Sequence, residues 1–326
     1  MIGQTGLIGV TGATGFVGKA LVTHLLATSA CSLRIAVRND RVDNAPRLQV
    51  VGTQALSPDN CWTEFVTGVE VIVHCAARVH VLAETHSDPS SEYHRANVLG
   101  TLNLAEQAAA AGVKRFIFIS SIKVNGEATA PGSAFEADAP PRPLDPYGVS
   151  KMEAEQGLRE LARRTGMEVV IIRPVLVYGP GVKANFLNMM RWLNKGVPLP
   201  LGALHNKRSL VALDNLVDLI ATCLAHPAAA NQTFLVSDDH DLSTTELLRQ
   251  IGKALGKPAR LLPVPVWILE GLATGLGRRN ISQRLCGSLQ VDISKTRNLL
   301  GWVPPTTVED AMLQTARYFQ EHQHDA

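Results

Sequence analysis

The chain has 326 residues, and its 31 basic and 29 acidic side chains nearly cancel to a formal net charge of +2. This balance gives no reason to expect nucleic acid or an anionic membrane surface as a partner. Hydrophobic residues make up 46% of the chain and charged ones only 18%, which excludes intrinsic disorder and predicts one large core with a smaller lobe. The five cysteines lack CxxC spacing, so we expect free thiols in a reducing cytoplasm, without a metal site or disulfide framework.

Short apolar, β-branched runs alternate with helical segments in the first half of the chain. The expected strands cover residues 7–11, 33–37, 48–51, 69–75, 115–120 and 168–173, and expected helices include residues 19–27, 101–111 and 147–165. Because parallel strands need crossover helices, this alternation predicts an α/β fold with a doubly wound parallel sheet.

The regularity weakens after residue 178, where proline and glycine become frequent. We therefore expect a larger domain in residues 1–178 and a smaller, mixed substrate lobe mainly in residues 179–326, with a strand near residues 231–237 that returns to the first sheet. The apolar stretch 261–276 is interrupted by proline and glycine and is too short to span a bilayer, so it predicts a helix that packs an apolar face.

A glycine motif follows the first expected strand directly. Residues 9–18 read Gly-Val-Thr-Gly-Ala-Thr-Gly-Phe-Val-Gly and open the next helix. Glycines allow a tight turn and a close approach to pyrophosphate, while the helix N-terminus offers amide donors to the anion. This is the fingerprint of a dinucleotide-binding (Rossmann) domain, and its predicted contacts are Gly12, Thr14, Gly15, Phe16, Val17 and Gly18.

The residue after the second expected strand bears on the choice of coenzyme. Arg38 stands where an acidic residue would bond the ribose 2′-hydroxyl of NAD. A guanidinium there suits a 2′-phosphate, so NADP(H) is favoured and NAD(H) stays possible. The alternatives are that Arg38 stacks on adenine or faces solvent, and that Asp40 serves the ribose.

Tyr147 and Lys151 lie four residues apart and hence on one face of an expected helix. A neighbouring cation favours phenolate, which makes the tyrosine a usable acid and base for a carbonyl or alcohol. Ser121 ends the fifth expected strand at the carboxyl edge, where open α/β sheets hold ligands. Either serine at that strand end, Ser120 or Ser121, is also explained as an ordinary cap, so its assignment depends on the Tyr-Lys pair.

Together these residues resemble the extended short-chain dehydrogenase/reductase family, in its NAD-dependent epimerase/dehydratase branch. The resemblance runs over nearly the whole chain and includes His74-Cys75-Ala76-Ala77, residues 97–101 and residues 173–181. It implies that Tyr147 is the proton donor or acceptor, that Lys151 orients the nicotinamide ribose and lowers the phenol pKa, and that Ser121 polarises the substrate oxygen. It adds Cys75, Ala76, Ala77, Asn97 and Pro174 to the coenzyme site, Asn97 as a structural brace, and it implies a homodimer through residues 101–111 and 147–165.

The nucleotide-sugar branch of that family holds a nucleoside diphosphate in its smaller lobe. By resemblance, the amide groups at Asn185 and Phe186 meet the nucleotide and Arg208 clamps the diphosphate, although a surface ion pair also explains this arginine. Arg284 is a second phosphate candidate with Arg278 and Arg279 as competitors. Lys123, Arg78, His80 and His205 are either sugar contacts or a polar pocket rim.

Three chemistries share this framework. A 4,6-dehydratase carries an Asp-Glu pair after the catalytic hydroxyl, and Ile122-Lys123 stands there instead, which argues against dehydration. Arg38 favours a reductase that uses NADPH. The segments around Ser121 and Arg208 also resemble the reductases of UDP-4-keto-6-deoxy-N-acetylhexosamines, which act in polysaccharide (lipopolysaccharide) precursor synthesis. This reductase is the leading interpretation. The alternative is a UDP-glucose or UDP-N-acetylglucosamine 4-epimerase that retains NAD, although Asn125 stands where epimerases have tyrosine. A coenzyme-sensing regulator without catalysis is a distant third.

Overall fold

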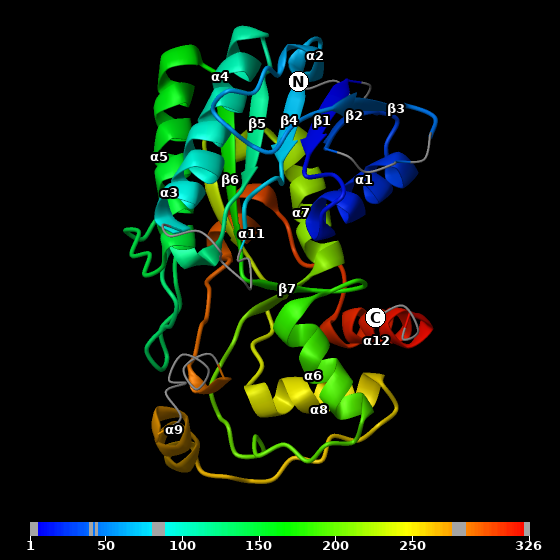
Figure 1. Ribbon diagram of the computed structural model, residues 1–326, viewed down its shortest axis with the longest axis vertical. Coiled ribbons are helices and arrows are strands. Elements are labelled where there is room, and N and C mark those ends of the chain that lie inside the picture. The colour runs from blue at the N-terminus through cyan, green and yellow to red at the C-terminus, as the bar shows by residue number, and fades with distance from the viewer. Residues whose placement is uncertain (1–5, 39–41, 43–44, 80–88, 276–284, 323–326) are drawn as a thin grey trace.

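The computed structural model describes residues 6–38, 42, 45–79, 89–275 and 285–322. Its larger layer is a parallel sheet of seven strands in the order β3-β2-β1-β4-β5-β6-β9 (Figure 1). The strands are β1 Leu7–Thr11, β2 Ser32–Val37, β3 Leu48–Gly52, β4 Val71–His74, β5 Arg115–Ile119, β6 Glu168–Pro174 and β9 Thr233–Val236. The predicted doubly wound parallel sheet is confirmed.

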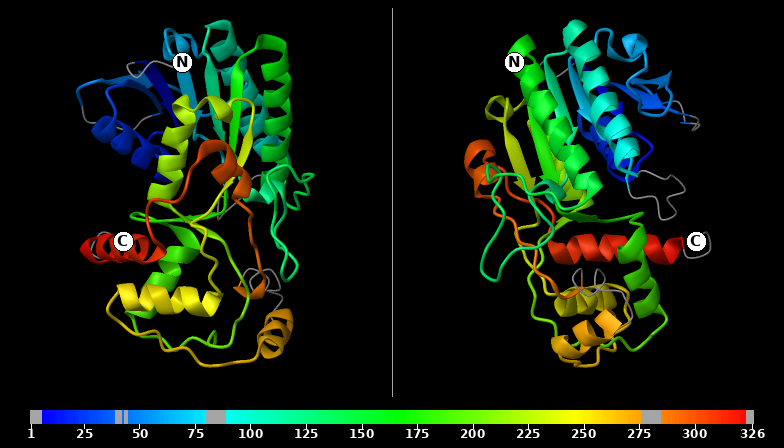
Figure 2. Two further views of the ribbon diagram at one scale, coloured as in Figure 1. Left: turned by 180° about the vertical axis from the view of Figure 1, so that it is seen from behind. Right: turned by 60° about the vertical axis from the view of Figure 1, so that its left-hand side comes forward.

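Helices cover both faces of this sheet, as the views of Figure 2 show. On one face α1 (Phe16–Thr28) packs against α7 (Leu213–Ala225), and on the other α4 (Thr101–Ala110) packs against α5 (Pro146–Thr165). The short helices α2 (Thr63–Val66) and α3 (Pro89–Tyr93) contact α4 and α5, respectively.

The buried strands supply side chains to a separate core on each face. In β5, Phe116 and Phe118 join the core under α4 and α5, while Ile117 and Ile119 join the core under α1 and α7. Because successive side chains point to opposite faces, a strand covered on both sides must be apolar throughout. That requirement explains the continuous apolar runs in the sequence.

Two segments beside the sheet depart from α-helical geometry. A π-helical turn, His94–Gly100, leads directly into α4, and a 3-10 helix, Ile122–Val124, follows β5. Another 3-10 helix, Pro227–Ala229, precedes β9. Both of the first two segments border the carboxyl edge of the sheet, where the predicted site residues lie.

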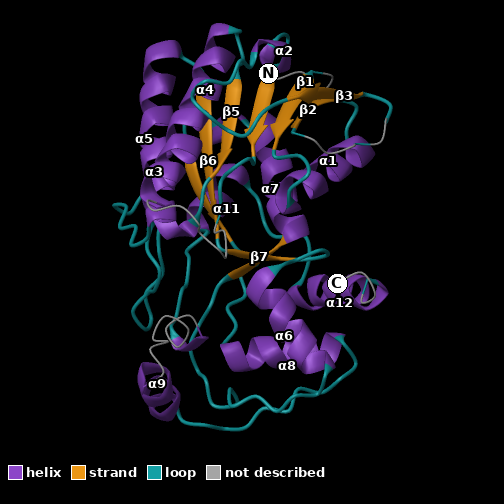
Figure 3. Cartoon of the chain, viewed as in Figure 1, coloured by secondary structure: helices purple, strands orange, loops and turns teal. Residues whose placement is uncertain are grey.

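The smaller lobe is mostly helix and loop (Figure 3). The parallel pair β7 (Leu176–Tyr178) and β8 (Leu210–Ala212) connects it to the sheet. In its core, the rings of Tyr178 and Phe186 stack on each other, and Met190, Leu248 and Met312 belong to the same apolar cluster. The helices of this part are α6 Ala184–Asn194, α8 Thr244–Ala254, α9 Val266–Gly275 and α12 Val308–Glu321, while α11 Ser294–Leu300 packs against β9.

The prediction of one helix over residues 261–276 is wrong at its start. Leu261 pairs with Leu199 in an isolated bridge, and α9 begins only at Val266. Pro263 and Pro265 explain the difference, because proline lacks an amide hydrogen and disfavours helix at the preceding residue. In the part of the chain that the structure describes, no helix is long and apolar enough to cross a membrane.

Candidate active site

The glycine motif forms a tight turn between β1 and α1. Gly12 has a φ of +66°, and a Cβ there would lie 2.6 Å from the amide nitrogen of Ala76. A Cβ on Gly18 would lie 2.2 Å from the carbonyl oxygen of Gly12. Both positions therefore need glycine for backbone to approach backbone.

The start of α1 fits an anionic ligand. Gly15 is the N-cap and provides no side-chain cap, and the first turn, which contains Phe16 and Val17, holds no acidic residue. Thr14 and Gly15 are exposed. The amide groups of this turn thus remain available to a pyrophosphate, and the structure fits the dinucleotide expected from the motif.

The end of β4 lies against this turn. His74 is fully buried between two hydroxyls, with Nδ1 2.7 Å from Thr11 Oγ1 and Nε2 3.0 Å from Thr101 Oγ1. Burial lowers the pKa of His74 to about 3, so the ring is neutral and acts structurally. Burial also raises the pKa of the Cys75 thiol to about 12. Ala76 and Ala77, which follow, are half-buried.

Asn97 links three segments from within the π-helical turn. Its Oδ1 accepts from the Arg78 amide at 2.8 Å, and its Nδ2 donates to the Arg78 carbonyl at 3.0 Å and to Ser150 Oγ at 3.1 Å. These bonds tie the segment after β4 to α5. These contacts suit the structural role expected for Asn97.

Ser121, Tyr147 and Lys151 reach the carboxyl edge from β5 and α5. Ser121 caps the 3-10 helix by accepting from the Lys123 amide at 3.2 Å. Lys151 is buried, and its Nζ donates to the Ile119 carbonyl at 2.9 Å and lies 6.0 Å from the centre of the Tyr147 ring. The ammonium group therefore stands between the end of β5 and the phenol.

The pKa of Tyr147 shifts against the sequence expectation. Burial raises the pKa of this phenol, and the Asp145 carboxylate and the Tyr93 phenol raise it further. The Lys151 ammonium donates to the Ile119 carbonyl and lies 4.4 Å from the centre of the Phe118 ring. The raised pKa follows from burial, Asp145 and Tyr93, and the role of Lys151 in lowering the pKa of the phenol stays a prediction. Burial lowers the pKa of Lys151 itself to about 8.

Asp145 positions the first turn of α5. Its Oδ1 accepts from the Gly148 amide at 2.7 Å as the N-cap, and Pro146 occupies the first turn. Lys123, a predicted sugar contact, forms ion pairs with Asp145 and, at 3.5 Å, with Glu127. A role for Lys123 toward substrate must therefore compete with these carboxylates.

The remaining predicted residues lie around the two lobes. Arg38 is exposed after β2, and Pro174 ends β6 opposite Val236. Asn185 is exposed in the first turn of α6. The Phe186 ring is buried, so this residue can face a ligand only through its backbone. Arg208 donates from Nη1 to the Gly287 carbonyl at 3.2 Å. The candidates Asp40, His80, Arg278, Arg279 and Arg284 lie outside the described residues.

Sequence reasoning missed a buried ionic network beneath the site. Glu155 accepts from Arg173 Nη2 at 2.6 Å, from Arg173 Nε at 2.8 Å and from Ser120 Oγ at 2.6 Å. Arg173 Nη1 also donates to Asn125 Oδ1 at 2.9 Å. The available signal was the position of Glu155, one turn beyond Lys151 on the buried face of α5. The Asn125 side chain is therefore part of this buried network through its bond to Arg173.

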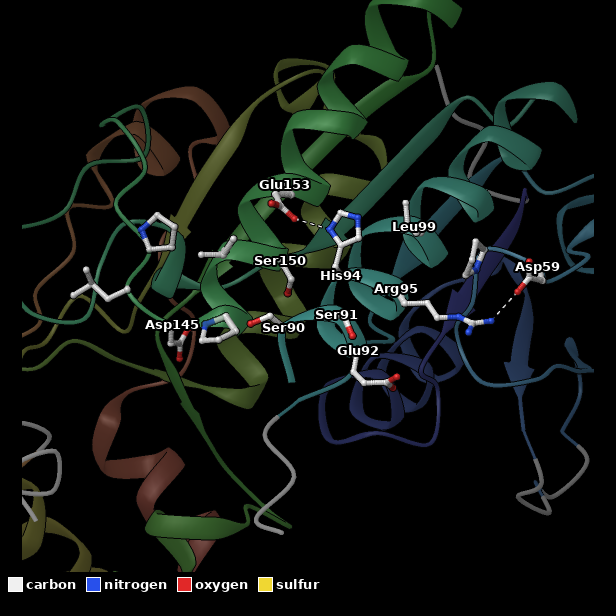
Figure 4. A pocket seen from close by; sticks show the side chains of 15 residues that line it. Asp59, Ser90, Ser91, Glu92, His94, Arg95, Leu99, Asp145, Ser150 and Glu153 are labelled. Carbon is white, nitrogen blue, oxygen red and sulfur yellow. Dashed lines mark hydrogen bonds and ion pairs between the residues drawn. The ribbon is translucent and has the colours of Figure 1, made fainter. Parts of the chain in front are cut away.

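The large pocket of Figure 4 lies on the outer side of α5. It has a volume of about 1030 Å³, and Leu99, Val149 and Glu153 are among its lining residues. A hydrogen bond of 2.9 Å between His94 Nδ1 and Glu153 Oε2 crosses it. Ser121, Tyr147 and Lys151 do not line it, so it is separate from the candidate active site.

Comparisons with known proteins agree with this geometry. Residues 8–237 match the family described as "NAD dependent epimerase/dehydratase family". A UDP-glucose 4-epimerase of Vibrio cholerae is 50% identical over 314 residues, which is 95% of this chain and 94% of the relative. An Escherichia coli O157:H7 relative, N-acetyl-alpha-D-glucosaminyl-diphospho-ditrans,octacis-undecaprenol 4-epimerase, is 28% identical over 94% of this chain and 93% of its own.

The fold also occurs among solved structures. A UDP-glucuronic acid 4-epimerase from Bacillus cereus in complex with NAD superposes with a TM-score of 0.77 at 21% identity, covering 97% of each chain. At that identity the likeness concerns the fold, and it agrees with the parallel sheet and glycine turn described above.

Proposed function

Because the chain belongs to the NAD dependent epimerase/dehydratase family, we propose that it oxidises or reduces carbon 4 of a UDP-hexose or UDP-N-acetylhexosamine. The observation that carries this proposal is the convergence of Ser121, Tyr147 and Lys151 on the sheet edge that the glycine turn borders. The N-acetylhexosamine is included because the E. coli relative is named for an N-acetylglucosaminyl substrate.

Each of the three residues has a role that its position allows. Tyr147 Oη exchanges a proton with the oxygen on carbon 4, and Ser121 Oγ hydrogen-bonds that oxygen. Lys151 supplies positive charge beside the phenol and holds the end of β5 through the Ile119 carbonyl. When bound, the nicotinamide coenzyme supplies or accepts the hydride.

The coenzyme is assigned to the glycine turn and the neighbouring strand ends. The α1 amides would hold its pyrophosphate, and the residues after β4 and Pro174 after β6 would border its nicotinamide half. Arg38, exposed where the adenine ribose would lie, favours NADP(H) by offering a guanidinium to a 2′-phosphate. Arg38→Ser should weaken NADPH binding by tenfold or more with little change for NADH, measured by fluorescence titration. Equal effects on both coenzymes would refute the assignment.

The nucleoside diphosphate is assigned to the smaller lobe. The amides at Asn185 and Phe186, in the first turn of α6, offer donors to it, and Arg208 offers positive charge. Arg208→Met should raise KM for the UDP-sugar more than tenfold with a smaller change in kcat, because it removes binding that is uniform along the reaction.

Two reactions at carbon 4 remain, and each has an observation in its favour. Identity of 50% with a UDP-glucose 4-epimerase favours 4-epimerisation, and we place this first. Asn125 bonds Arg173 inside the protein, so its difference from the epimerase pattern no longer weighs against that reaction. Arg38 favours the second candidate, NADPH-dependent reduction of a UDP-4-keto-6-deoxy-N-acetylhexosamine for polysaccharide precursor synthesis.

The two reactions differ in coenzyme consumption. An epimerase converts UDP-glucose to UDP-galactose, or UDP-GlcNAc to UDP-GalNAc, without net loss of coenzyme. A reductase oxidises one NADPH for each UDP-4-keto-6-deoxy-N-acetylhexosamine. Purified protein should perform one of these reactions, and failure at both would overturn the proposed function and favour a coenzyme-sensing role.

Tyr147→Phe tests the assignment of the acid and base. It removes the phenol proton and almost no volume, so kcat should fall by at least 100-fold while coenzyme affinity stays nearly constant. Tyr318→Phe is the matched control, since Tyr318 is 38% exposed on α12 and stacks on His322. Turnover that survives in Tyr147→Phe would show that another group moves the proton.

The assembly and location are proposed as well. We propose a homodimer through the outer faces of α4 and α5, which the pocket of Figure 4 borders, and a cytoplasmic enzyme with reduced thiols. Light scattering after gel filtration should give twice the chain mass of 35.1 kDa, and a monomer would refute the dimer.

A further inference from the structure

The end of the smaller lobe farthest from the parallel sheet is formed by two loops and α9 (Figures 1 and 2). The loops run side by side: the Leu199 amide donates to the Arg260 carbonyl at 2.9 Å, and the Leu262 amide donates to the Leu199 carbonyl at 2.8 Å. Lys257 Nζ donates to the Asn194 carbonyl at the end of α6, at 2.9 Å. This surface, residues 192–199 and 257–267, is termed the lobe tip.

Large apolar side chains are exposed on the lobe tip. Trp267 is 71% exposed, Leu262 53%, Trp192 47% and Val197 39%. Single exposed apolar residues need no explanation, but these four belong to two segments that are hydrogen-bonded side by side at one end of the lobe. Tryptophan is also enriched at the boundary between water and lipid.

The same surface carries charge of one sign. Residues 169–213 and 247–269 contain no Asp or Glu, and Glu270 is the first acidic residue after the second stretch. Lys195, Lys257 and Arg260 are exposed there. Lys253, on α8, is paired with Glu309 at 2.7 Å and is not counted with them. The net charge of +2 conceals this asymmetry, because it sums over the whole chain.

We propose that the lobe tip docks on an anionic lipid bilayer. Exposed tryptophan and aliphatic side chains beside cations are the combination that binds peripherally to such a surface. The binding is interfacial and requires no membrane-spanning helix. The proposal goes beyond the net charge, which by itself gives no reason to expect an anionic membrane surface as a partner.

Vesicle co-sedimentation tests the docking. The full chain should bind vesicles of phosphatidylcholine with phosphatidylglycerol and not vesicles of phosphatidylcholine alone, and added salt should weaken the binding. Each neutralised cation should reduce partitioning about fivefold, so Lys257→Gln combined with Arg260→Gln should reduce it about 25-fold. Trp267→Ser should also reduce it, and the wild-type tryptophan emission should shift to shorter wavelength on binding.

Matched controls separate the lobe tip from general surface effects. Arg317→Gln removes an exposed cation on α12, and Leu144→Ser removes an apolar side chain that is 75% exposed elsewhere. Both controls should bind vesicles like wild type. Absence of wild-type binding, equal binding to neutral vesicles, or equal losses in the controls would overturn the proposal. Turnover of soluble UDP-sugar, measured on the same variants, tests the proposed function independently.

Discussion

The Glu155–Arg173 pair should contribute strongly to stability because both groups are buried. Glu155 is 0% exposed and Arg173 1%, and two hydrogen bonds of 2.6 and 2.8 Å join them. Glu155→Ala leaves the guanidinium in the core without its counter-ion. Removing one partner of such a pair costs about 3–5 kcal/mol. Asn125 and Ala137 still accept from Arg173, which places the expected loss near the lower figure.

Urea unfolding measures this loss as a lower midpoint at an unchanged slope. Glu309→Ala is the matched control, because the Lys253–Glu309 pair is 2.7 Å long but both side chains are more than half exposed. That control should cost less than about 1 kcal/mol. A Glu155→Ala loss as small as the control's would refute the reasoning.

A double substitution separates the charge from the packing. Glu155→Leu with Arg173→Met removes both charges and should recover much of the stability, because a buried pair often stabilises no more than apolar residues of similar volume. Activity should not recover with it if the pair also positions Ser121 through Ser120. Recovery of both would show that the network serves stability alone.

Further predictions concern the glycine turn and the titrating groups. Gly18→Ala should abolish coenzyme binding, since its Cβ would lie 2.2 Å from the Gly12 carbonyl oxygen. The Cβ of Gly15→Ala would lie 3.1 Å from the same oxygen, so this variant should bind the coenzyme more tightly than Gly18→Ala in the same titration. The pKa of Lys151 is about 8 against the usual 10.5, so the folded chain binds fewer protons than the unfolded chain between these values. The unfolding free energy should therefore rise with pH across that window, and Lys151→Met should remove the rise. Asp145→Asn keeps a cap but removes a charge that raises the pKa of Tyr147, so the pH-rate profile should shift to lower pH.

The fold was predictable from sequence because parallel strands covered on both faces must be apolar where both faces are buried, and residues 116–119 of β5 are an example. The glycine turn was predictable because its steric demands act over a few neighbouring residues. The direction of the Tyr147 pKa was not, since it depends on burial by segments distant in the chain. The start of α9 differs from the prediction for a local reason, because Pro263 and Pro265 disfavour a helix before Val266.

The Glu155–Arg173 contact was also beyond sequence reasoning. Glu155 lies on α5 and Arg173 near the end of β6, 18 positions later, and no local sequence pattern predicts that these two side chains meet. A charged residue on the buried face of α5 indicated only that a partner must exist.

The order in which the chain passes between the sheet and the smaller lobe limits how that lobe can be exchanged in evolution. After β7 the chain enters the lobe, returns with α7 and β9 to complete the sheet, and leaves again toward α8. A recombination event after Tyr178 would remove the edge strand β9, leaving β6 unpaired on one side, and would strip α7 from α1. The smaller lobe is therefore more readily changed within the two segments between these returns, while the sheet is inherited whole.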